Sequence, residues 1–315
     1  MEKLLTFWID DQTHRNMPLS QGIIMEKAKI LYLELKNRTE ECSTAEGFVA
    51  SRGWFERFKL RANLHSISLS GESASADKES AKVFKKNLED IIKQKNYPRQ
   101  LIFNFDETGL FWKKMPSKTF ISKEEISASG FKAAKDRLTL LLGGNSTGDF
   151  RMKPLLIYHS ENPRAMKGIS KQSLPVIWMA NQKSWMTAIL FKKWYQEHFC
   201  PAVKSYCERN VLEKKALLIL DNAPGHPQNL SEFQTCLPVE IIFTPPNTTS
   251  ILQPMDQGVI ATFKAYYIRK TFKQLFQAVD SNQCSIKEFW KNFNIMNAIE
   301  NIGSSWQEVQ QSCLK

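Results

Sequence analysis

The stretch FNFDETGLF (103–111) carries Asp106 at the end of an apolar run, and LLILDNAPGH (217–226) carries Asp221 at the end of another. Short apolar runs bounded by turn residues predict buried strands. The functional groups of open α/β sheets lie beyond the carboxyl ends of their strands. We therefore expect the two aspartates at one edge of a parallel or mixed sheet.

A third aspartate, Asp256, lies in NTTSILQPMDQGVI (247–260), where a long helical pattern opens. Clustered carboxylates repel one another and are costly to desolvate, so they usually coordinate hard cations such as Mg²⁺ or Mn²⁺. The three aspartates predict a metal site suited to phosphoryl chemistry, in which two ions activate water and stabilise the leaving oxygen. Gln253 and Gln257 flank Asp256 and either steer its carboxylate or contact a DNA backbone.

Each of these residues also has a purely structural interpretation. Asp106 and Asp221 can cap turns, and Asp256 can be the first-turn acid of its helix, where the helix dipole favours negative charge. His226 either orients a phosphate or a water near the metals or only hydrogen-bonds the turn after Asp221. Glu107 is expected to support the site behind the metal ligands or to be structural.

The composition is that of a globular protein, and its charge favours a polyanionic partner. The chain has 315 residues, enough for two domains or one large one, with 42% apolar and 24% charged residues. Its 43 basic and 32 acidic residues leave a net charge of +11. The excess lies in 113–153 (9 basic, 4 acidic) and 160–215 (10 basic, 4 acidic), whereas 1–70 is nearly neutral. Nucleic acid is the expected partner, because each phosphate contact gains from counterion release; a basic surface without a partner is the alternative.

Several other classes of protein are disfavoured. No apolar run approaches the ~18 residues of a membrane span, and the start, MEKLLTFWIDDQ, has no basic region before an apolar stretch, as a secretory signal would. The six cysteines include no C-x-x-C pair, so free thiols are favoured over a zinc site. Phosphate-loop, nucleophile-elbow and H-E-x-x-H motifs do not occur.

Residues 20–36, 44–51 and 52–64 predict three short helices. The last is basic on its outer side, which matches a helix-turn-helix whose final helix enters the major groove. A plain helical bundle with a solvated face is the alternative. The DNA contacts of the first interpretation are Arg52, Arg57, Lys59 and Arg61, while Trp54, Phe55 and Phe58 face inward.

The rest of the chain predicts an α/β sheet with helices on its faces. A Ser-rich linker is expected at 66–78, followed by a helix at 78–95. The strands are expected at 100–106, 137–144, 153–159, 216–221 and 239–243, and two further helices at 187–207, bent at Pro201, and at 255–278.

Five stretches resemble the Tigger branch of the pogo/Tc1–mariner group, within the DDE superfamily of transposases. They are FNFDETGLFWKKMPS, FKAAKDRLTLLLGGN, KPLLIYHSENPRA, LLILDNAPGHP and PNTTSILQPMDQGVI. The N-terminal stretches PLSQGIIMEKA and ASRGWFERFK resemble the second helix-turn-helix of centromere-protein-B-type DNA-binding domains. The resemblance covers nearly the whole chain.

The resemblance implies an RNase H-like fold in which Asp106, Asp221 and Asp256 bind two Mg²⁺ or Mn²⁺ ions. We add His226 to these candidate catalytic residues. The implied reaction is hydrolysis of a DNA phosphodiester, followed by attack of the freed 3′-hydroxyl on target DNA, without a covalent enzyme intermediate. Double-stranded DNA is the expected partner and the nucleus the expected location, and a homodimer is left open.

We expect a helix-turn-helix domain at 1–69, a linker and helix at 70–99, a DDE domain at 100–278 and a C-terminal helical segment at 279–315. Members of this family usually carry another small helix-turn-helix before the first and further helices after the last, so both ends are expected to be shortened. A domesticated or decayed DNA-binding protein without catalysis is therefore the competing hypothesis, and enzymatic activity stays open. A cellular RNase H-like nuclease unrelated to transposition is disfavoured by the helix-turn-helix.

Overall fold

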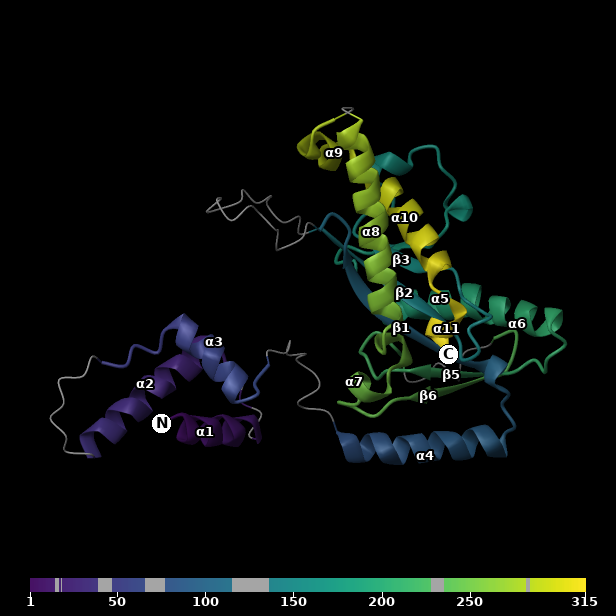
Figure 1. The fold of residues 1–315 in the computed structure, drawn as a ribbon. Coiled ribbons are helices and arrows are strands. Elements are labelled where there is room, and N and C mark those ends of the chain that lie inside the picture. The colour runs from purple at the N-terminus through teal and green to yellow at the C-terminus, as the bar shows by residue number, and fades with distance from the viewer. Residues whose placement is uncertain are drawn as a thin grey trace. The chain divides into compact units, whose positions relative to one another are not determined.

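The computed structural model describes residues 1–14, 17, 19–38, 47–65, 77–114, 136–227, 235–281 and 284–315. The chain forms two compact units, Met1–Ser75 and Ala76–Lys315 (Figure 1). None of the described helices combines the length and apolar character needed to cross a membrane.

The first unit contains helices α1 (Glu2–His14), α2 (Gln21–Arg38) and α3 (Arg52–Arg61). The side chains at its centre are buried apolar ones at four- or three-residue spacing, which places them on one face of each helix. They include Leu5, Ile9, Ile24, Ala28, Phe55 and Phe58. Ser51 caps α3, because its hydroxyl accepts a hydrogen bond of 3.2 Å from the backbone N–H of Trp54.

The first unit differs from the sequence-based predictions in two places. Helix α1 was not predicted, although Leu5 and Ile9 mark its buried face. The helix expected at 44–51 is wrong in its described part: residues 47–51 are not helical, and Ala50 has a φ of 45°, a left-handed conformation that interrupts a helix. Residues 44–46 lie outside the described residues. The other two helices are confirmed by α2 and α3.

The second unit contains a six-stranded mixed sheet in the order β4-β3-β2-β1-β5-β6. Its strands are β1 (Ile102–Phe111), β2 (Arg137–Asn145), β3 (Leu155–Tyr158), β4 (Ile177–Ala180), β5 (Ala216–Leu220) and β6 (Val239–Phe243). Strand β2 is antiparallel to β1 and β3, whereas the pairs β3–β4, β1–β5 and β5–β6 are parallel. All of β5 is buried, as expected for an apolar strand near the middle of a covered sheet.

Helices cover both faces of this sheet (Figure 1). On one face lie α5 (Ala188–Trp194), the π-helical turn η4 (Tyr195–Phe199) and α6 (Cys200–Arg209). On the other lie α8 (Val259–Asp280), α9 (Ile286–Asn292) and α10 (Ile295–Glu308). Helix α4 (Lys78–Gln94) packs Leu88 and Ile92 against β1 and β5. The shorter elements are η1 (Arg99–Leu101), η2 (Arg164–Met166), η3 (Lys171–Ser173), α7 (Thr249–Leu252), η6 (Pro254–Asp256) and α11 (Gln311–Leu314).

The α/β prediction is confirmed, but two candidate aspartates lie differently from expectation. Strand β1 continues to Phe111 because β2 pairs with it over most of its length, so Asp106 lies within a strand rather than at its end. Asp256 lies in the 3₁₀ turn η6, before the long helix rather than in it. Gly258, with a φ of 121°, separates the turn from α8, which begins at Val259.

Other boundaries also differ. The helix expected at 187–207 is irregular at η4, ahead of Pro201, because proline has no N–H to donate to the carbonyl four residues earlier. Strand β4 was not predicted. Most of the expected linker, 66–76, lies outside the described residues, and the helix after it is confirmed by α4, with Asp77 as its N-cap.

Candidate active site

Asp106 lies in the central strand β1, opposite Leu142 of β2. The Leu142 side chain belongs to the core on the α8 face of the sheet. Glu107 is opposite Leu141, which belongs to the core on the α5 face. Because successive side chains of a strand point to opposite faces, Asp106 and Glu107 project from opposite sides of the sheet.

Asp221 follows directly after β5, at the level of Asp106. Strands β1 and β5 pair in parallel with Asn104 opposite Ile219, and each of these residues precedes its aspartate by two positions. Two positions along an extended chain return to the same face. The register therefore places Asp221, which follows the last residue of β5, at the level of Asp106 in the neighbouring strand.

A buried amide network joins these strands to the turn that carries Asp256. The Asn104 amide donates to the carbonyl of Ile219 (3.0 Å) and to Oε1 of Gln253 (2.7 Å). Its Oδ1 accepts from the backbone N–H of Met255 (3.3 Å), the residue before Asp256. Gln253 is fully buried and donates in turn to the Phe105 carbonyl (3.4 Å). Gln253 thus serves the architecture of the site rather than reaching a DNA backbone.

Asp106 is only 6% exposed and lies near three other carboxylates. Burial raises the pKa of Asp106, and the negative charges of Asp256, Glu107 and Asp221 raise it further, to about 8. Asp221 and Asp256 therefore both lie within electrostatic range of Asp106. Asp106 holds a proton at neutral pH in the absence of a cation.

His226 bridges Glu107 and Asp221. Its Nε2 lies 3.0 Å from Oε1 of Glu107, and its Nδ1 lies 2.8 Å from Oδ1 of Asp221. Burial opposes a charge on this ring, but the hydrogen bonds with Asp221 and Glu107 outweigh it and raise the pKa of His226 to about 10. Both ring nitrogens then donate, and the ring is held against Phe191 with centroids 4.5 Å apart.

The donor set fits a hard divalent cation. Among the described residues, Glu107, Asp221 and His226 present ligand atoms that all lie within 4.8 Å of one another. With Asp106 and Asp256, the carboxylates offer the oxygen donors that Mg²⁺ and Mn²⁺ prefer. A cation would relieve the repulsion that raises the pKa of Asp106. His226 does not serve as a ligand while both of its nitrogens carry protons.

Lys264 of α8 lies near the same carboxylates. Burial lowers the pKa of its ammonium group, while Asp256 and Asp106 act in the opposite direction. Lys114 also contributes to the lowering. Lys264, with Lys114 near it, adds positive charge to the surroundings of the acidic group.

A cavity of about 370 Å³ opens beside Glu107 and His226. Trp185 lines it and keeps 59% of its surface exposed. The Arg137 guanidinium lies 5.3 Å from the Trp185 ring centroid, and Asn181 accepts a 3.1 Å hydrogen bond from the Trp185 backbone N–H. A fixed aromatic ring beside a cation suits stacking on a planar group that carries negative charge.

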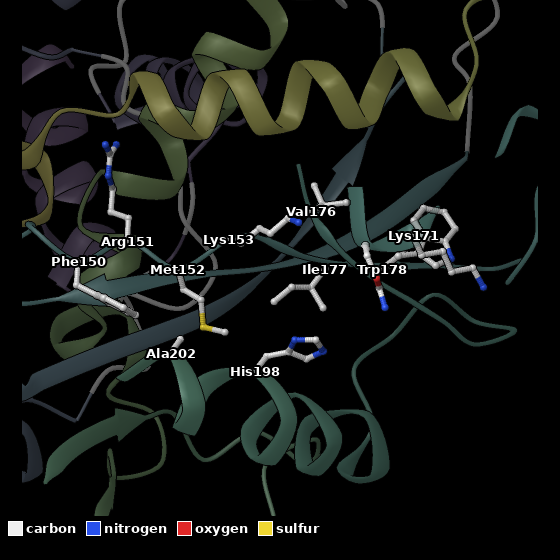
Figure 2. Close-up of a pocket in the computed structure, with 11 residues that line it drawn as sticks. Phe150, Arg151, Met152, Lys153, Lys171, Val176, Ile177, Trp178, His198 and Ala202 are labelled. Carbon is white, nitrogen blue, oxygen red and sulfur yellow. The ribbon is translucent and has the colours of Figure 1, made fainter. Parts of the chain in front are cut away.

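A second cavity, of about 470 Å³, lies at the start of β4, where Met152, Ile177 and His198 line it (Figure 2). It shares no lining residue with the candidate active site.

The four predicted DNA contacts all lie in α3, but only two of them form ion pairs with described residues. Arg61 pairs with Glu2 through contacts of 3.1 and 2.6 Å, and Lys59 pairs with Glu56 at 2.8 Å. Arg52 and Arg57 are exposed and make no ion pair with a described residue. Trp54 stacks on Phe58 with centroids 5.3 Å apart and donates to Glu2 (3.1 Å), in agreement with its expected place in the core.

Sequence reasoning missed several residues of this site. Asn104 is a polar residue in an otherwise apolar run, which is the one signal of its buried network. The bond from Glu107 to His226 joins residues 119 positions apart and has no local signature. Lys264 and Arg137 are ordinary basic residues until the fold places them beside the carboxylates.

Two family profiles match the chain. Residues 135–315 match the DDE superfamily endonuclease family, and residues 1–68 match the Tc5 transposase DNA-binding domain. A solved Mos1 transposase paired-end complex with left transposon end is similar at 13% identity and a TM-score of 0.47, covering 100% of this chain and 79% of that one.

Two human proteins are similar to most of the chain. The human (Homo sapiens) Jerky protein homolog is 34% identical over 270 residues, covering 85% of this chain and 46% of that protein. The human Tigger transposable element-derived protein 7 is 31% identical over 317 residues, covering 96% of this chain and 56% of that protein. The chain thus spans about half the length of these relatives. The profile match over more than half of its residues shows that the chain belongs to the DDE superfamily endonuclease family.

Proposed function

We propose that the chain binds double-stranded DNA and cleaves its phosphodiester bonds with two divalent cations, Mg²⁺ or Mn²⁺. Residues 1–69 would bind DNA, 100–278 would hold the catalytic site, and 70–99 and 279–315 would connect and complete them. The observation that carries the proposal is the convergence of carboxylates on Asp106, whose pKa they help to raise to about 8. Such repulsion is costly in a folded protein unless a ligand uses it.

Asp106, Asp221 and Asp256 would hold the cations, which supply Lewis-acid stabilisation of the phosphoryl oxygens and an activated water. Asp106 would have to be deprotonated to serve as a ligand. His226 holds Oδ1 of Asp221, leaving Oδ2 for a cation. The ammonium group of Lys264, near Asp256 and Asp106, would form an ion pair with the phosphate. A freed 3′-hydroxyl could then be positioned at the same site for attack on a second DNA strand.

Exposed residues of α3 support the DNA-binding half of the proposal. Arg52 and Arg57 are the two predicted contacts that make no ion pair among the described side chains, so they reach a phosphate or a base edge without breaking an internal bond. Lys59 and Arg61 would first have to leave Glu56 and Glu2. With DNA as the partner, we place the protein in the nucleus, and we include a homodimer in the proposal as the state in which two DNA ends are held.

A second candidate function is DNA binding without catalysis. One observation favours it: Asp221 already forms a close ion pair with His226, whose protonated ring neutralises part of the acidic cluster. In that case the acidic group would be a structural feature of the fold, and only α3 would be functional.

Plasmid nicking distinguishes the two. Purified protein is incubated with supercoiled plasmid and Mg²⁺ or Mn²⁺, beside Asp221→Ala and Asp106→Asn variants and an EDTA control. Nicking that requires the metal and both aspartates supports the endonuclease. Retardation of the plasmid at moderate salt without nicking supports the second candidate. If the protein neither nicks nor retards the plasmid, the DNA-binding half of the proposal is contradicted as well.

A further inference from the structure

The cavity of about 470 Å³ at the start of β4 lies away from the candidate active site. Its walls come from the segment before β3, the first residues of β4 and the helical segment η4–α6. Strand β3 is parallel to β1, so the cavity lies at the amino-terminal ends of these strands, whereas Asp221 follows the carboxyl end of β5. The two sites therefore occupy opposite ends of the sheet.

Apart from the neutral Gln172, the polar residues that line this cavity are basic. The lining includes Arg151, Lys153, Lys171 and His198 and no acidic residue. The lysine-rich segment 160–215, with 10 basic and 4 acidic residues, contributes two of these side chains. The remaining lining is largely apolar, from Phe150, Met152, Val176, Ile177, Trp178 and Ala202. An anion joined to a flat or apolar group is the ligand class that such a lining accommodates.

Lys153 and His198 are available to such a ligand. Within the described part of the chain, neither side chain makes a hydrogen bond or an ion pair, in contrast to Lys171, which lies 3.3 Å from Glu161. Burial lowers the pKa of Lys153. Burial also lowers the pKa of His198, and the positive charges of Lys193 and Lys153 lower it further, against the opposing charge of Glu197.

The helical wall is built so that His198 faces the strands. His198 belongs to the π-helical turn η4, a rare geometry that occurs frequently at functional sites. Figure 2 shows its imidazole directed from this wall toward Ile177. Arg151 instead turns toward α10, where it donates to the carbonyls of Trp306 (3.1 Å), Gln307 (3.2 Å) and Val309. These bonds engage the Arg151 guanidinium, whereas Lys153 and His198 keep their polar groups for a ligand.

We propose that this cavity binds a phosphate group through Lys153 and His198, with the apolar lining accepting the sugar or base attached to it. The phosphate belongs either to a free nucleotide or to a DNA backbone. The proposal does not depend on phosphodiester cleavage at the carboxylates, so a catalytically inactive protein would still show it.

Isothermal titration of the purified full chain with adenosine 5′-monophosphate, and with adenosine as the probe lacking phosphate, tests the proposal. Affinity for a duplex of about 20 base pairs is measured in parallel in EDTA. Lys153→Ala and His198→Ala are compared with Lys183→Ala, which removes an exposed lysine outside the cavity. Ala202→Leu narrows the cavity without changing its charge, and circular dichroism and thermal melts verify that each variant is folded.

Loss of a charge-assisted hydrogen bond should weaken phosphate binding about tenfold to a hundredfold. Binding of the monophosphate but not adenosine, weakened by both cavity variants and by Ala202→Leu, identifies a nucleotide site. A loss of duplex affinity in these variants that exceeds the loss in Lys183→Ala, without monophosphate binding, identifies a DNA-backbone site. The proposal is overturned if folded cavity variants bind both phosphate probes as the control variant does.

Discussion

Asp106→Asn should change the pH dependence of stability in the metal-free protein. In the folded chain, burial and the charges of Asp256, Glu107 and Asp221 raise the pKa of Asp106 from 3.8 to about 8. A group whose pKa is raised by folding stabilises fully below its unfolded pKa, and the stabilisation is lost as the pH rises through its folded pKa. Between pH 5 and 7 the unfolded carboxyl is already ionised, while the folded one stays protonated. At about 1.4 kcal/mol per pH unit, the wild-type protein should lose on the order of 2–3 kcal/mol through this group.

The measurement is urea unfolding of wild type and Asp106→Asn in EDTA at the two pH values, followed by tryptophan fluorescence. The asparagine cannot ionise, so the stability difference between the proteins should shift by about 2–3 kcal/mol in favour of the variant between pH 5 and 7. Millimolar Mg²⁺ at pH 7 should stabilise the wild type and have little effect on the variant, because the cation binds the folded state through Asp106. A difference that stays constant within about 0.5 kcal/mol across this range would refute the placement of Asp106 among repelling charges, since surface carboxyls give shifts of that size.

Three further outcomes are expected. His226→Ala should destabilise the protein by roughly 3–5 kcal/mol in urea unfolding, because two carboxylates lose the buried cation between them; a cost below about 1 kcal/mol would contradict the bridge. Arg57→Ala should weaken DNA binding and reduce the slope of log affinity against log salt by about 1, whereas an unchanged slope would remove α3 as the DNA reader. Gly143→Ala should cost at least about 3 kcal/mol or prevent folding, because its Cβ would lie 2.2 Å from the Phe105 ring; a normal melting temperature would contradict the close approach of β1 and β2.

Local patterns predicted most of the architecture of the second unit. The apolar runs of β1, β2, β3, β5 and β6 and the apolar stripe of α4 were recognisable, because strand and helix periodicity are local properties of sequence. The extent of β1 was not recognisable, since it depends on pairing with β2. The same holds for the left-handed Ala50, which prevents the helix expected at 44–51 from including residues 47–51.

The acidic residues of the candidate site could be predicted from the sequence, but the hydrogen bonds that hold them could not. Each aspartate stood in a distinctive stretch, so Asp106, Asp221 and Asp256 could be named from the sequence. Whether they act as a metal triad stays a prediction. The partners that hold them, such as Glu107 for His226, come from distant segments, and burial and pairing of this kind are decided by tertiary contacts.

The hydrogen bonds of the Asn104 amide bear on which related sequences can keep this arrangement of carboxylates. One side chain joins β5 and the turn before Asp256 to the strand of Asp106, so the mutual placement of three carboxylates depends on a residue that is not acidic. Deamidation of Asn104, or a codon change to aspartate, would turn two donated hydrogen bonds into repulsion between oxygens. A gene copy could thus lose the mutual placement of its carboxylates while all three aspartates remain in its sequence, and a comparison of related sequences should consider this asparagine together with the acids.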